Sequence, residues 1–221
     1  MRLALVTGGS RGIGKAIEKN FLSKGYEVFC PTRSELDLSD LENVQSFIFK
    51  HRNLNVDILV NNAGQNIVQP MMDIDFKTWT DIQNINVNSV FLLTQGFAAG
   101  MIERKWGRIV NIASLFSFLT KEGRASYTTS KTALVGFTRT SAVELGKYNI
   151  LVNALSPGFV DTELTRKNNS PQKINEICQA IPIGRMSTPE EVSEVTAFLA
   201  SEANTYLTGQ NIVVDGGYSI L

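Results

Sequence analysis

The sequence predicts an α/β fold built on a doubly wound parallel sheet flanked by helices, and three observations support this. Short runs rich in Val, Ile and Leu alternate with longer helical patterns, as buried parallel strands alternate with crossover helices. The first run leads into a glycine cluster, VTGGSRGIG at 6–14, which is where a Rossmann-type fold turns from strand to helix. No linker, repeat or low-complexity tract interrupts the 221 residues, so a single NAD(P)-binding domain over 1–221 is expected.

Six apolar runs are the expected strands, at 2–7, 26–31, 56–62, 107–113, 150–156 and 210–216. Helical patterns fill the intervals, at 12–25, 41–52, 79–105, 126–146, about 170–180, and 188–202. In the last of these, Thr188 is suited to cap the helix and Pro189 to occupy its first position.

One interval is too short for the expected topology. After the second strand, only Ser34 and Glu35 separate Arg33 from another extended run, LDLSD at 36–40. A parallel crossover usually needs a dozen residues or more. The sequence therefore predicts that the helix between the second and third strands is shortened or absent.

Charge and cysteine content exclude several classes of function. With 21 basic and 21 acidic residues, the chain has no bulk field for nucleic acid or an anionic membrane. Cys30 and Cys178 show neither metal-site spacing nor a disulfide-rich pattern, which favours a reducing compartment and no metal site. The N-terminal apolar run LALV is too short for a signal peptide or a membrane span. A cytoplasmic location is expected.

The glycine cluster is a candidate phosphate site. Gly8, Gly12 and Gly14 allow a tight turn and a close approach of backbone amides to a pyrophosphate, and the helix N-terminus adds partial positive charge. The spacing is T-G-x-x-x-G-x-G and not G-x-G-x-x-G, so a plain strand–helix turn is the alternative.

A second candidate site lies at Ser114, Tyr127 and Lys131. Tyr127 and Lys131 are four apart on a predicted helix, hence on one face. A neighbouring ammonium favours the phenolate and lowers the pKa of a tyrosine. Ser114, at the end of a strand, is placed to hydrogen-bond a carbonyl or alcohol oxygen, so the three would form a proton relay for carbonyl reduction. The alternative is a surface pair on an amphipathic helix.

Taken together, these motifs resemble the short-chain dehydrogenase/reductase family. The residues that carry the resemblance are TGGSRGIG at 7–14, NNAG at 61–64, Asn86 in INVNSVF, the Ser–Tyr–Lys set, and PGFVDT at 157–162. The resemblance covers essentially the whole chain, including PIGRMSTPEEV and the terminal TGQNIVVDGG. It is strongest to the single-domain branch that includes 3-oxoacyl-[acyl-carrier-protein] reductases.

The resemblance implies four catalytic residues. Tyr127 would be the general acid, and Lys131 would bind the nicotinamide ribose and tune Tyr127. Ser114 would polarise the carbonyl, and Asn86 would kink its helix to hold a water in the proton path.

The same resemblance implies the cofactor-binding residues. Asn62 to Gly64 would flank the adenosine ribose, Asp37 and Leu38 match an adenine-binding pair, and residues 157–162 would receive the nicotinamide carboxamide and a phosphate. The full implied set is Gly8, Ser10, Arg11, Gly12, Ile13, Gly14, Thr32, Arg33, Asp37, Leu38, Asn62, Ala63, Gly64, Tyr127, Lys131, Pro157, Gly158, Val160 and Thr162.

The end of the second strand bears on cofactor choice. Thr32 stands where NAD-binding relatives carry an acidic residue, which would repel a 2′-phosphate. Arg33 follows with a planar donor fork suited to phosphate, and Arg11 is a second cation nearby. NADP(H) is therefore expected ahead of NAD(H).

The expected function is an NADPH-dependent oxidoreductase that reduces a ketone, for instance a 3-oxoacyl thioester, to an alcohol. Alternatives are an NAD(P)-dependent alcohol, sugar or steroid dehydrogenase and a non-catalytic dinucleotide-binding sensor, although sensors typically lose the catalytic Tyr or Lys. Residues 115–125 and 163–182 would form the substrate pocket walls and lid.

Two kinds of partner are expected. Arg104 and Lys105 form a basic pair that would suit an acidic carrier protein. A homo-oligomer, tetramer or dimer, is expected because the helical patterns at 79–105 and 126–146 carry more apolar residues than one sheet-facing stripe needs, namely Phe91, Leu92, Phe97, Leu134 and Phe137.

Overall fold

A six-stranded, all-parallel sheet forms the centre of the structure, a computed structural model that describes residues 1–220 except the side chains of residues 164 and 168. The strands are β1 Leu3–Val6, β2 Glu27–Phe29, β3 Val56–Asn61, β4 Gly107–Ile112, β5 Ile150–Pro157 and β6 Asn211–Val214. Their order is β2-β1-β3-β4-β5-β6. All six expected strands are present, so the prediction of a doubly wound parallel sheet is confirmed. The strand order reverses between β1 and β3, and ligands of such sheets bind at this switch point.

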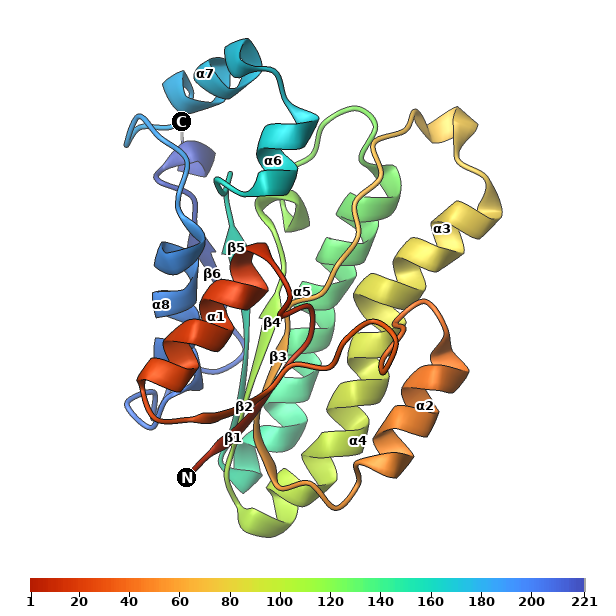
Figure 1. Cartoon of the computed structure of the whole chain (residues 1–221), viewed down its shortest axis with the longest axis vertical. Coiled ribbons are helices and arrows are strands. Elements are labelled where there is room, and N and C mark those ends of the chain that lie inside the picture. Colours follow the sequence, from red (N-terminus) through yellow and green to blue (C-terminus); the bar gives the residue numbers. More distant parts are fainter. Residues whose placement is uncertain (221) are drawn as a thin grey trace.

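Helices cover both faces of the sheet (Figure 1). They are α1 Gly12–Ser23, α2 Leu41–Lys50, α3 Phe76–Gln83, α4 Ser89–Arg104, α5 Ala125–Leu145, α6 Glu163–Asn168, α7 Pro171–Gln179 and α8 Pro189–Ala200. In Figure 1, α1 and α8 lie on one face, α2, α4 and α5 lie on the other, and α6 and α7 sit together at one end. The core accordingly has two main parts, one under α1 and α8 with Ile17 and Val192, the other under α2 and α4 with Phe47 and Phe97.

The segment after β2 confirms one part of the sequence prediction and corrects another. Only a turn at residues 33–35 follows β2 before the LDLSD run, so no helix stands there. The run itself is not a strand: residues 36–40 are irregular with a turn at 38–39, and Leu36 and Leu38 are buried in the core beside α2. The helix that crosses from β2 to β3 is α2 itself. Its N-cap is Asp40, whose side chain accepts from the amides of Glu42 and Asn43.

The long helical pattern at 79–105 is not one regular α-helix. A π-helical turn, Asn84–Asn88, separates α3 from α4. Length and composition alone would allow Phe76–Arg104, with a mean hydropathy of 1.3 over its most apolar window, to cross a membrane. However, α4 buries Leu93, Phe97 and Met101 in the core on the sheet. Core helices of soluble proteins meet the same length and composition criterion, so it indicates no membrane span here.

The start of α8 is fixed by a capping box, as its sequence predicts. The Thr188 hydroxyl accepts from the amide of Glu191, and the Glu191 carboxylate accepts from the amide of Thr188. Arg185 adds two further hydrogen bonds to the Glu191 carboxylate, at 2.7 and 2.8 Å. Arg185 therefore ties the incoming chain to α8.

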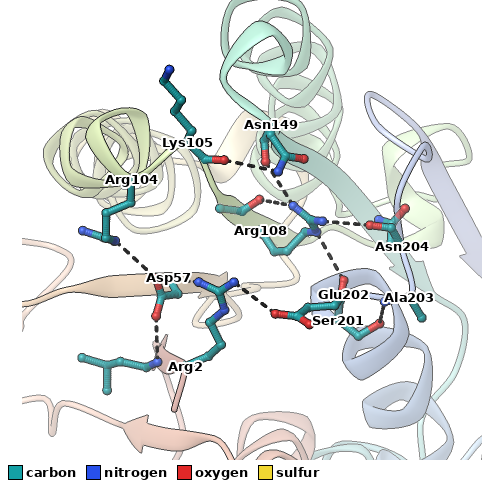
Figure 2. Close-up of polar contacts among 12 residues, drawn as sticks. Arg2, Asp57, Arg104, Lys105, Arg108, Asn149, Ser201, Glu202, Ala203 and Asn204 are labelled. Carbon is teal, nitrogen blue, oxygen red and sulfur yellow. Dashed lines mark hydrogen bonds and ion pairs between the residues drawn. The ribbon is translucent and has the colours of Figure 1, made fainter.

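A buried arginine organises the amino ends of the central strands (Figure 2). Arg108, 3% exposed, donates to the backbone carbonyls of Gly107, Asn149, Ser201 and Asn204 at 2.8–3.3 Å. Burial and the charge of Arg2 lower the pKa of Arg108. One guanidinium is thus bonded to the first residue of β4, to the residue before β5 and to the segment between α8 and β6.

Beside it, Arg104 is engaged in the fold. Its guanidinium donates to the Asp57 carboxylate at 3.3 Å (Figure 2) and to the Val56 carbonyl at 2.6 Å. These contacts direct Arg104 toward the amino end of β3. The sequence predicts that Arg104 and Lys105 form a basic pair that would suit an acidic carrier protein. For Arg104 this interpretation was wrong, because its guanidinium pairs with the Asp57 carboxylate of the same chain.

Candidate active site

The turn from β1 to α1 has the backbone of an anion cradle. Gly8 and Gly12 have φ of +70° and +54°, values that side chains rarely adopt. A Cβ on Gly14 would lie 2.1 Å from the Gly8 carbonyl oxygen, so only glycine fits there. Arg11 is the N-cap of α1, no side chain caps this end, and its first turn contains no acidic residue. The first amides of α1 are therefore available to a phosphate.

Next to this cradle, β3 ends in a clamp on the glycine turn. The Asn62 side chain donates to the carbonyls of Thr7 and Gly8 at 2.8 and 3.3 Å. The Thr7 hydroxyl accepts from the amides of Asn62 and Ala63, both at 3.0 Å. Asn62 and Ala63 thus fix the shape of the glycine turn, and the exposed Gly64 follows them.

The segment after β5 closes over the same turn. Gly158 donates its amide to the Val214 carbonyl at 2.8 Å, and a Cβ there would lie 2.7 Å from the Cα of Asp215. Val160 is buried and forms a bridge with Ser187. Thr162 caps α6, and a Cβ on Gly12 would lie 3.6 Å from its methyl group. The PGFVDT segment, with Pro157 buried at its start, therefore lies against the glycine turn.

Ser114 and Tyr127 meet at the carboxyl end of β4. Ser114 is buried, and its hydroxyl accepts from the amide of Phe116 at 3.2 Å. Burial raises the pKa of Tyr127, whereas a hydrogen bond with Ser114 and the charge of Arg124 lower it. Because burial dominates, the phenol keeps its proton at neutral pH and can donate it.

Lys131 lies one helical turn beyond Tyr127. It is 3% exposed, and its ammonium donates to the Ile112 carbonyl at 2.7 Å. The ammonium nitrogen is 5.7 Å from the centroid of the Tyr127 ring. Burial lowers the pKa of Lys131 to about 8. The cation thus lies near the tyrosine ring, and among the described residues its one hydrogen-bond acceptor is the Ile112 carbonyl.

Asn86 links the π-helical turn to this pair. Its side chain exchanges two hydrogen bonds with the backbone of Gln65, at 2.8 and 2.9 Å. It also donates to the Ser130 hydroxyl, which in turn donates to the Tyr127 carbonyl. A Cβ on Gly64 would lie 3.3 Å from both the Asn86 side-chain oxygen and the Lys131 ammonium. The expected kink at Asn86 is present as a π-helical turn, and it brings Asn86 and Lys131 to the same backbone.

The end of β2 holds a carboxylate that the sequence prediction did not include. Glu35 accepts from the amide and the hydroxyl of Thr32, both at 2.8 Å, and these bonds lower the pKa of Glu35. Arg33 is exposed and forms an ion pair of 3.6 Å with Asp37. Thr32 and Arg33 therefore each have an acidic neighbour.

Asp37 and Leu38 do not point the same way. The Asp37 carboxylate accepts from the amide and hydroxyl of Ser39, at 3.0 and 2.6 Å, which lowers its pKa. Leu38 packs in the core under α2. Ser10 and Arg11 are exposed, and Ile13 packs partly on the core under α1.

Further buried polar residues support the site without having been predicted. Asn61 donates to Asn111 at 2.8 Å, and Asn111 donates to Thr138 on α5 at 2.9 Å. This chain of hydrogen bonds joins β3, β4 and α5 near the candidate residues Ser114, Tyr127 and Lys131. The sequence feature that could have predicted these bonds is an amide side chain, Asn61 or Asn111, in each of the mainly apolar strand runs VNNAG and IVNIA.

Within the described residues, no cluster of His, Cys, Asp or Glu could hold a metal ion. The arrangement instead offers a phosphate cradle, a proton-donating tyrosine and a buried ammonium at one edge of the sheet. These are the parts needed to bind a dinucleotide and to protonate or deprotonate an oxygen beside it.

Comparison of the sequence with known proteins points the same way. Residues 31–219 match the model of a family described as enoyl-(acyl carrier protein) reductase. The 3-oxoacyl-[acyl-carrier-protein] reductase of Aquifex aeolicus is 36% identical over 98% of this chain and 96% of its own length.

Solved structures add dehydrogenases to these reductases. A proposed NAD(P)-dependent gluconate 5-dehydrogenase from Beutenbergia cavernae with bound NADP has a TM-score of 0.95 and 34% identity, covering 100% of this chain and 97% of its own. A 4-hydroxyisoleucine dehydrogenase complexed with NADH has a TM-score of 0.95 and 29% identity, with both chains covered completely.

Proposed function

The chain belongs to the short-chain dehydrogenase/reductase family, and on that premise we propose that it is an NADPH-dependent reductase of a ketone, with Tyr127 as the proton donor. Family membership makes it an NAD(P)-dependent oxidoreductase acting on CH–OH groups. The cofactor preference, the role of Tyr127 and the substrate are the parts proposed here. The single observation that carries the proposal is the placement of Tyr127 beside Ser114, with the Lys131 ammonium 5.7 Å from the centroid of its ring.

The residues present fit a nicotinamide dinucleotide. The glycine cradle has no room for a Cβ at Gly14, and the uncapped N-terminus of α1 supports pyrophosphate binding. Lys131 has ammonium protons left for the ribose hydroxyls after bonding Ile112. When bound, the nicotinamide supplies or accepts a hydride.

The chain's own residues would handle the proton. The Ser114 hydroxyl is placed to donate to the carbonyl oxygen, and the Tyr127 hydroxyl to give its proton to the same oxygen as negative charge develops. A phenolate left behind is stabilised by the nearby Lys131 and Arg124 cations. In the oxidative direction the same groups would remove the proton from the alcohol.

Two substrate classes follow from the relatives. The curated relatives act on 3-oxoacyl groups borne by an acyl carrier protein, and the solved structures include dehydrogenases of gluconate and 4-hydroxyisoleucine. We propose reduction of a ketone, either in a 3-oxoacyl thioester or in a free oxo acid, and the oxidative dehydrogenase is the second candidate. The presence of Ser114, Tyr127, Lys131 and Asn86 in one site argues against a non-catalytic sensor.

The preference for NADPH rests on the end of β2. Arg33 and Arg11 are both exposed on the side of the glycine turn and would suit a 2′-phosphate. Solved relatives include complexes with NADP and with NADH. Glu35 opposes this preference, because its carboxylate is bonded to Thr32.

Assembly and location are also proposals. Members of this family are typically oligomeric, and α5 exposes Val143 at 83% while α4 exposes Phe91 at 46%. We propose a homo-oligomer, tetramer or dimer, built partly on α4 and α5. Both cysteines are free thiols, which accords with the proposed cytoplasmic location.

The test is a reductase assay with purified protein, following NAD(P)H absorbance with small ketones, 3-oxoacyl thioesters and 3-oxo acids. We expect turnover with NADPH that exceeds turnover with NADH. Dinucleotide binding without any turnover would instead support the sensor, and turnover only of alcohols with the oxidised cofactor would support the dehydrogenase.

A further inference from the structure

Two basic residues in the loop before α5 have no assigned contact with substrate or cofactor. In the proposed proton transfer Arg124 acts only through its charge on Tyr127, and Lys121 takes no part. Lys121 and Arg124 belong to the segment that joins β4 to α5, and Arg124 precedes Tyr127 by three residues. None of the ion pairs among residues 1–220 includes either side chain. They form a cationic pair with no carboxylate partner in the described chain.

Arg124 is the more constrained of the two. Its side chain is half-buried, its guanidinium carbon lies 5.2 Å from the centroid of the Phe116 ring, and Phe116 packs edge-on against Tyr127. One terminal nitrogen, Nη1, is buried without a hydrogen-bond partner. The half-buried guanidinium therefore has donors that the described residues do not use, and a carboxylate could accept from those that are exposed.

Lys121 extends the same positive region. Its ammonium lies 5.4 Å from the ring of Phe159, in the segment after β5. The charges of Arg124 and of Lys173 on α7 act on Lys121 and lower its pKa, together with partial burial. The cations therefore line the side of the site between Tyr127 and the α6–α7 end.

The dinucleotide does not account for these charges. Its pyrophosphate is assigned to the glycine turn and α1, and its 2′-phosphate to the end of β2. Arg124 instead borders the residues that would receive the second reactant. Arg124 and Tyr127 both pack on the Phe116 ring, at 5.2 and 6.2 Å from its centroid, so we expect an anion on Arg124 to belong to the same small molecule as the oxygen on Tyr127.

We propose that Arg124, assisted by Lys121, is a carboxylate-binding subsite and that the substrate is a short oxo acid in its free, anionic form. This inference rests on the proposed ketone reductase and chooses between its two substrate forms. A neutral thioester would offer the Arg124 cation a carbonyl oxygen but no negative charge. A carboxylate would accept from the guanidinium fork in two bonds, and it would fix the carbonyl relative to Ser114 and Tyr127.

The test compares 4-oxopentanoate with its methyl ester, which has the same ketone but no charge, using NADPH as reductant. Because Arg124 also lowers the pKa of Tyr127, the readout is the ratio of kcat/KM for acid over ester and not either rate alone. In Arg124→Gln we expect this ratio to fall about 10- to 100-fold, the range for a hydrogen bond to a charged group. Arg124→Lys should recover part of the loss.

Arg52→Gln is the matched control, since Arg52 is an exposed arginine at the far end of α2, and it should leave the ratio unchanged. A change below about threefold in Arg124→Gln, with turnover intact, would overturn the subsite and leave the reductase standing. So would a wild-type preference for the acetoacetyl thioester of N-acetylcysteamine over the free acid.

If no ketone is reduced, the proposed function fails and calorimetry still decides the subsite. The protein saturated with NADP⁺ is titrated with 4-oxopentanoate and with the ester. Binding of the acid that is tighter than binding of the ester, and lost in Arg124→Gln, supports the subsite. Equal affinities in wild type and Arg124→Gln overturn it.

Discussion

The carboxylate of Glu35 accepts two hydrogen bonds from Thr32, one from the backbone amide and one from the hydroxyl, each at 2.8 Å. These bonds keep the pKa of Glu35 below its usual value, so the group is ionised at neutral pH. A negative charge therefore lies next to the residue at which an acidic side chain would favour NAD. The carboxylate that carries this charge belongs to Glu35, three residues after Thr32 in the sequence.

Glu35→Gln should strengthen NADPH binding relative to NADH. Removing a like charge near the 2′-phosphate favours the phosphorylated cofactor, by about three- to tenfold in affinity for a solvent-exposed group. Fluorescence titration of both cofactors measures the change. An equal change for the two cofactors would mean that Glu35 only shapes the turn at 33–35.

Arg33→Ala should have the opposite effect and weaken NADPH by about tenfold or more while sparing NADH. The same titrations apply, and Arg52→Ala provides an exposed-arginine control. If NADPH and NADH lose affinity equally, the ion pair with Asp37 is the main role of Arg33, and the proposed NADPH preference would be withdrawn.

Tyr127→Phe should reduce turnover by about 10²–10⁴-fold, the usual contribution of a general acid, because the phenol hydroxyl supplies the proton. Cofactor affinity should change little, since the glycine turn and Lys131 remain. Single-turnover kinetics together with NADPH titration test this. A variant that retains more than about a tenth of the wild-type chemical rate would exclude Tyr127 as the acid.

Lys131→Met should inactivate the enzyme but stabilise the cofactor-free protein at neutral pH. The pKa of Lys131 is about 8 in the folded chain and about 10.4 in an unfolded one. The unfolded state thus binds the proton more tightly, and wild-type stability rises between pH 8 and 10 as this proton is released. We expect the variant to gain about 1–3 kcal/mol at pH 7.

This gain should shrink as the pH approaches 10, which urea unfolding at pH 7 and 9.5 can measure. A variant that is less stable than wild type at both pH values would show that the bond to the Ile112 carbonyl outweighs the cost of burying the charge.

Arg108→Met should destabilise the fold by about 2–4 kcal/mol, because it leaves several buried carbonyls without a donor. Arg2→Met is the matched control: both guanidiniums stack on Trp106, at 3.8 Å for Arg2 and 4.5 Å for Arg108, but Arg2 is one-third exposed. We expect Arg2→Met to cost about 1 kcal/mol or less. Equal losses in urea unfolding would assign the effect to Trp106 stacking and not to the carbonyls.

The proposed assembly predicts a mass that is a multiple of 24.4 kDa in light scattering. Val143→Glu, which places a charge on the exposed face of α5, should lower that mass without unfolding the chain. A wild-type mass of one protomer at micromolar concentration would contradict the proposal, and an unchanged mass in the variant would exclude α5 from the interface.

The sequence predicted most of the fold because buried parallel strands carry a strong, local signal. Strands such as β3 and β5 are apolar along their whole length, and glycines and caps mark where helices begin. The LDLSD run misled for a definable reason: Leu36 and Leu38 alternate with polar residues like a strand, yet each is buried by packing under α2. Alternation alone cannot distinguish a strand from turns anchored by two leucines.

The candidate site also contains residues that the sequence predicted and residues that it did not. Tyr127, Lys131, Ser114 and Asn86 follow from motif and spacing, and the structure brings them together. Glu35 escaped prediction, and Arg124 was included only as part of the predicted pocket wall at 115–125. The proposed role of each depends on where a long side chain folds back, which sequence periodicity does not indicate. The strand order β2-β1-β3 likewise could not be predicted from the sequence, because it depends on the three-dimensional path of α2.

The π-helical turn between α3 and α4 has a consequence for how this enzyme tolerates change in length. A π turn contains one residue more than the α-helical turn it replaces, so everything after it is rotated by about 100° relative to an uninterrupted helix. Loss of any one residue from 84–88 would restore the regular helical phase and turn the apolar face of α4 away from the sheet. The position of the Asn86 side chain and the packing of α4 therefore depend on one additional residue in the helix. A deletion within 84–88 should disrupt both.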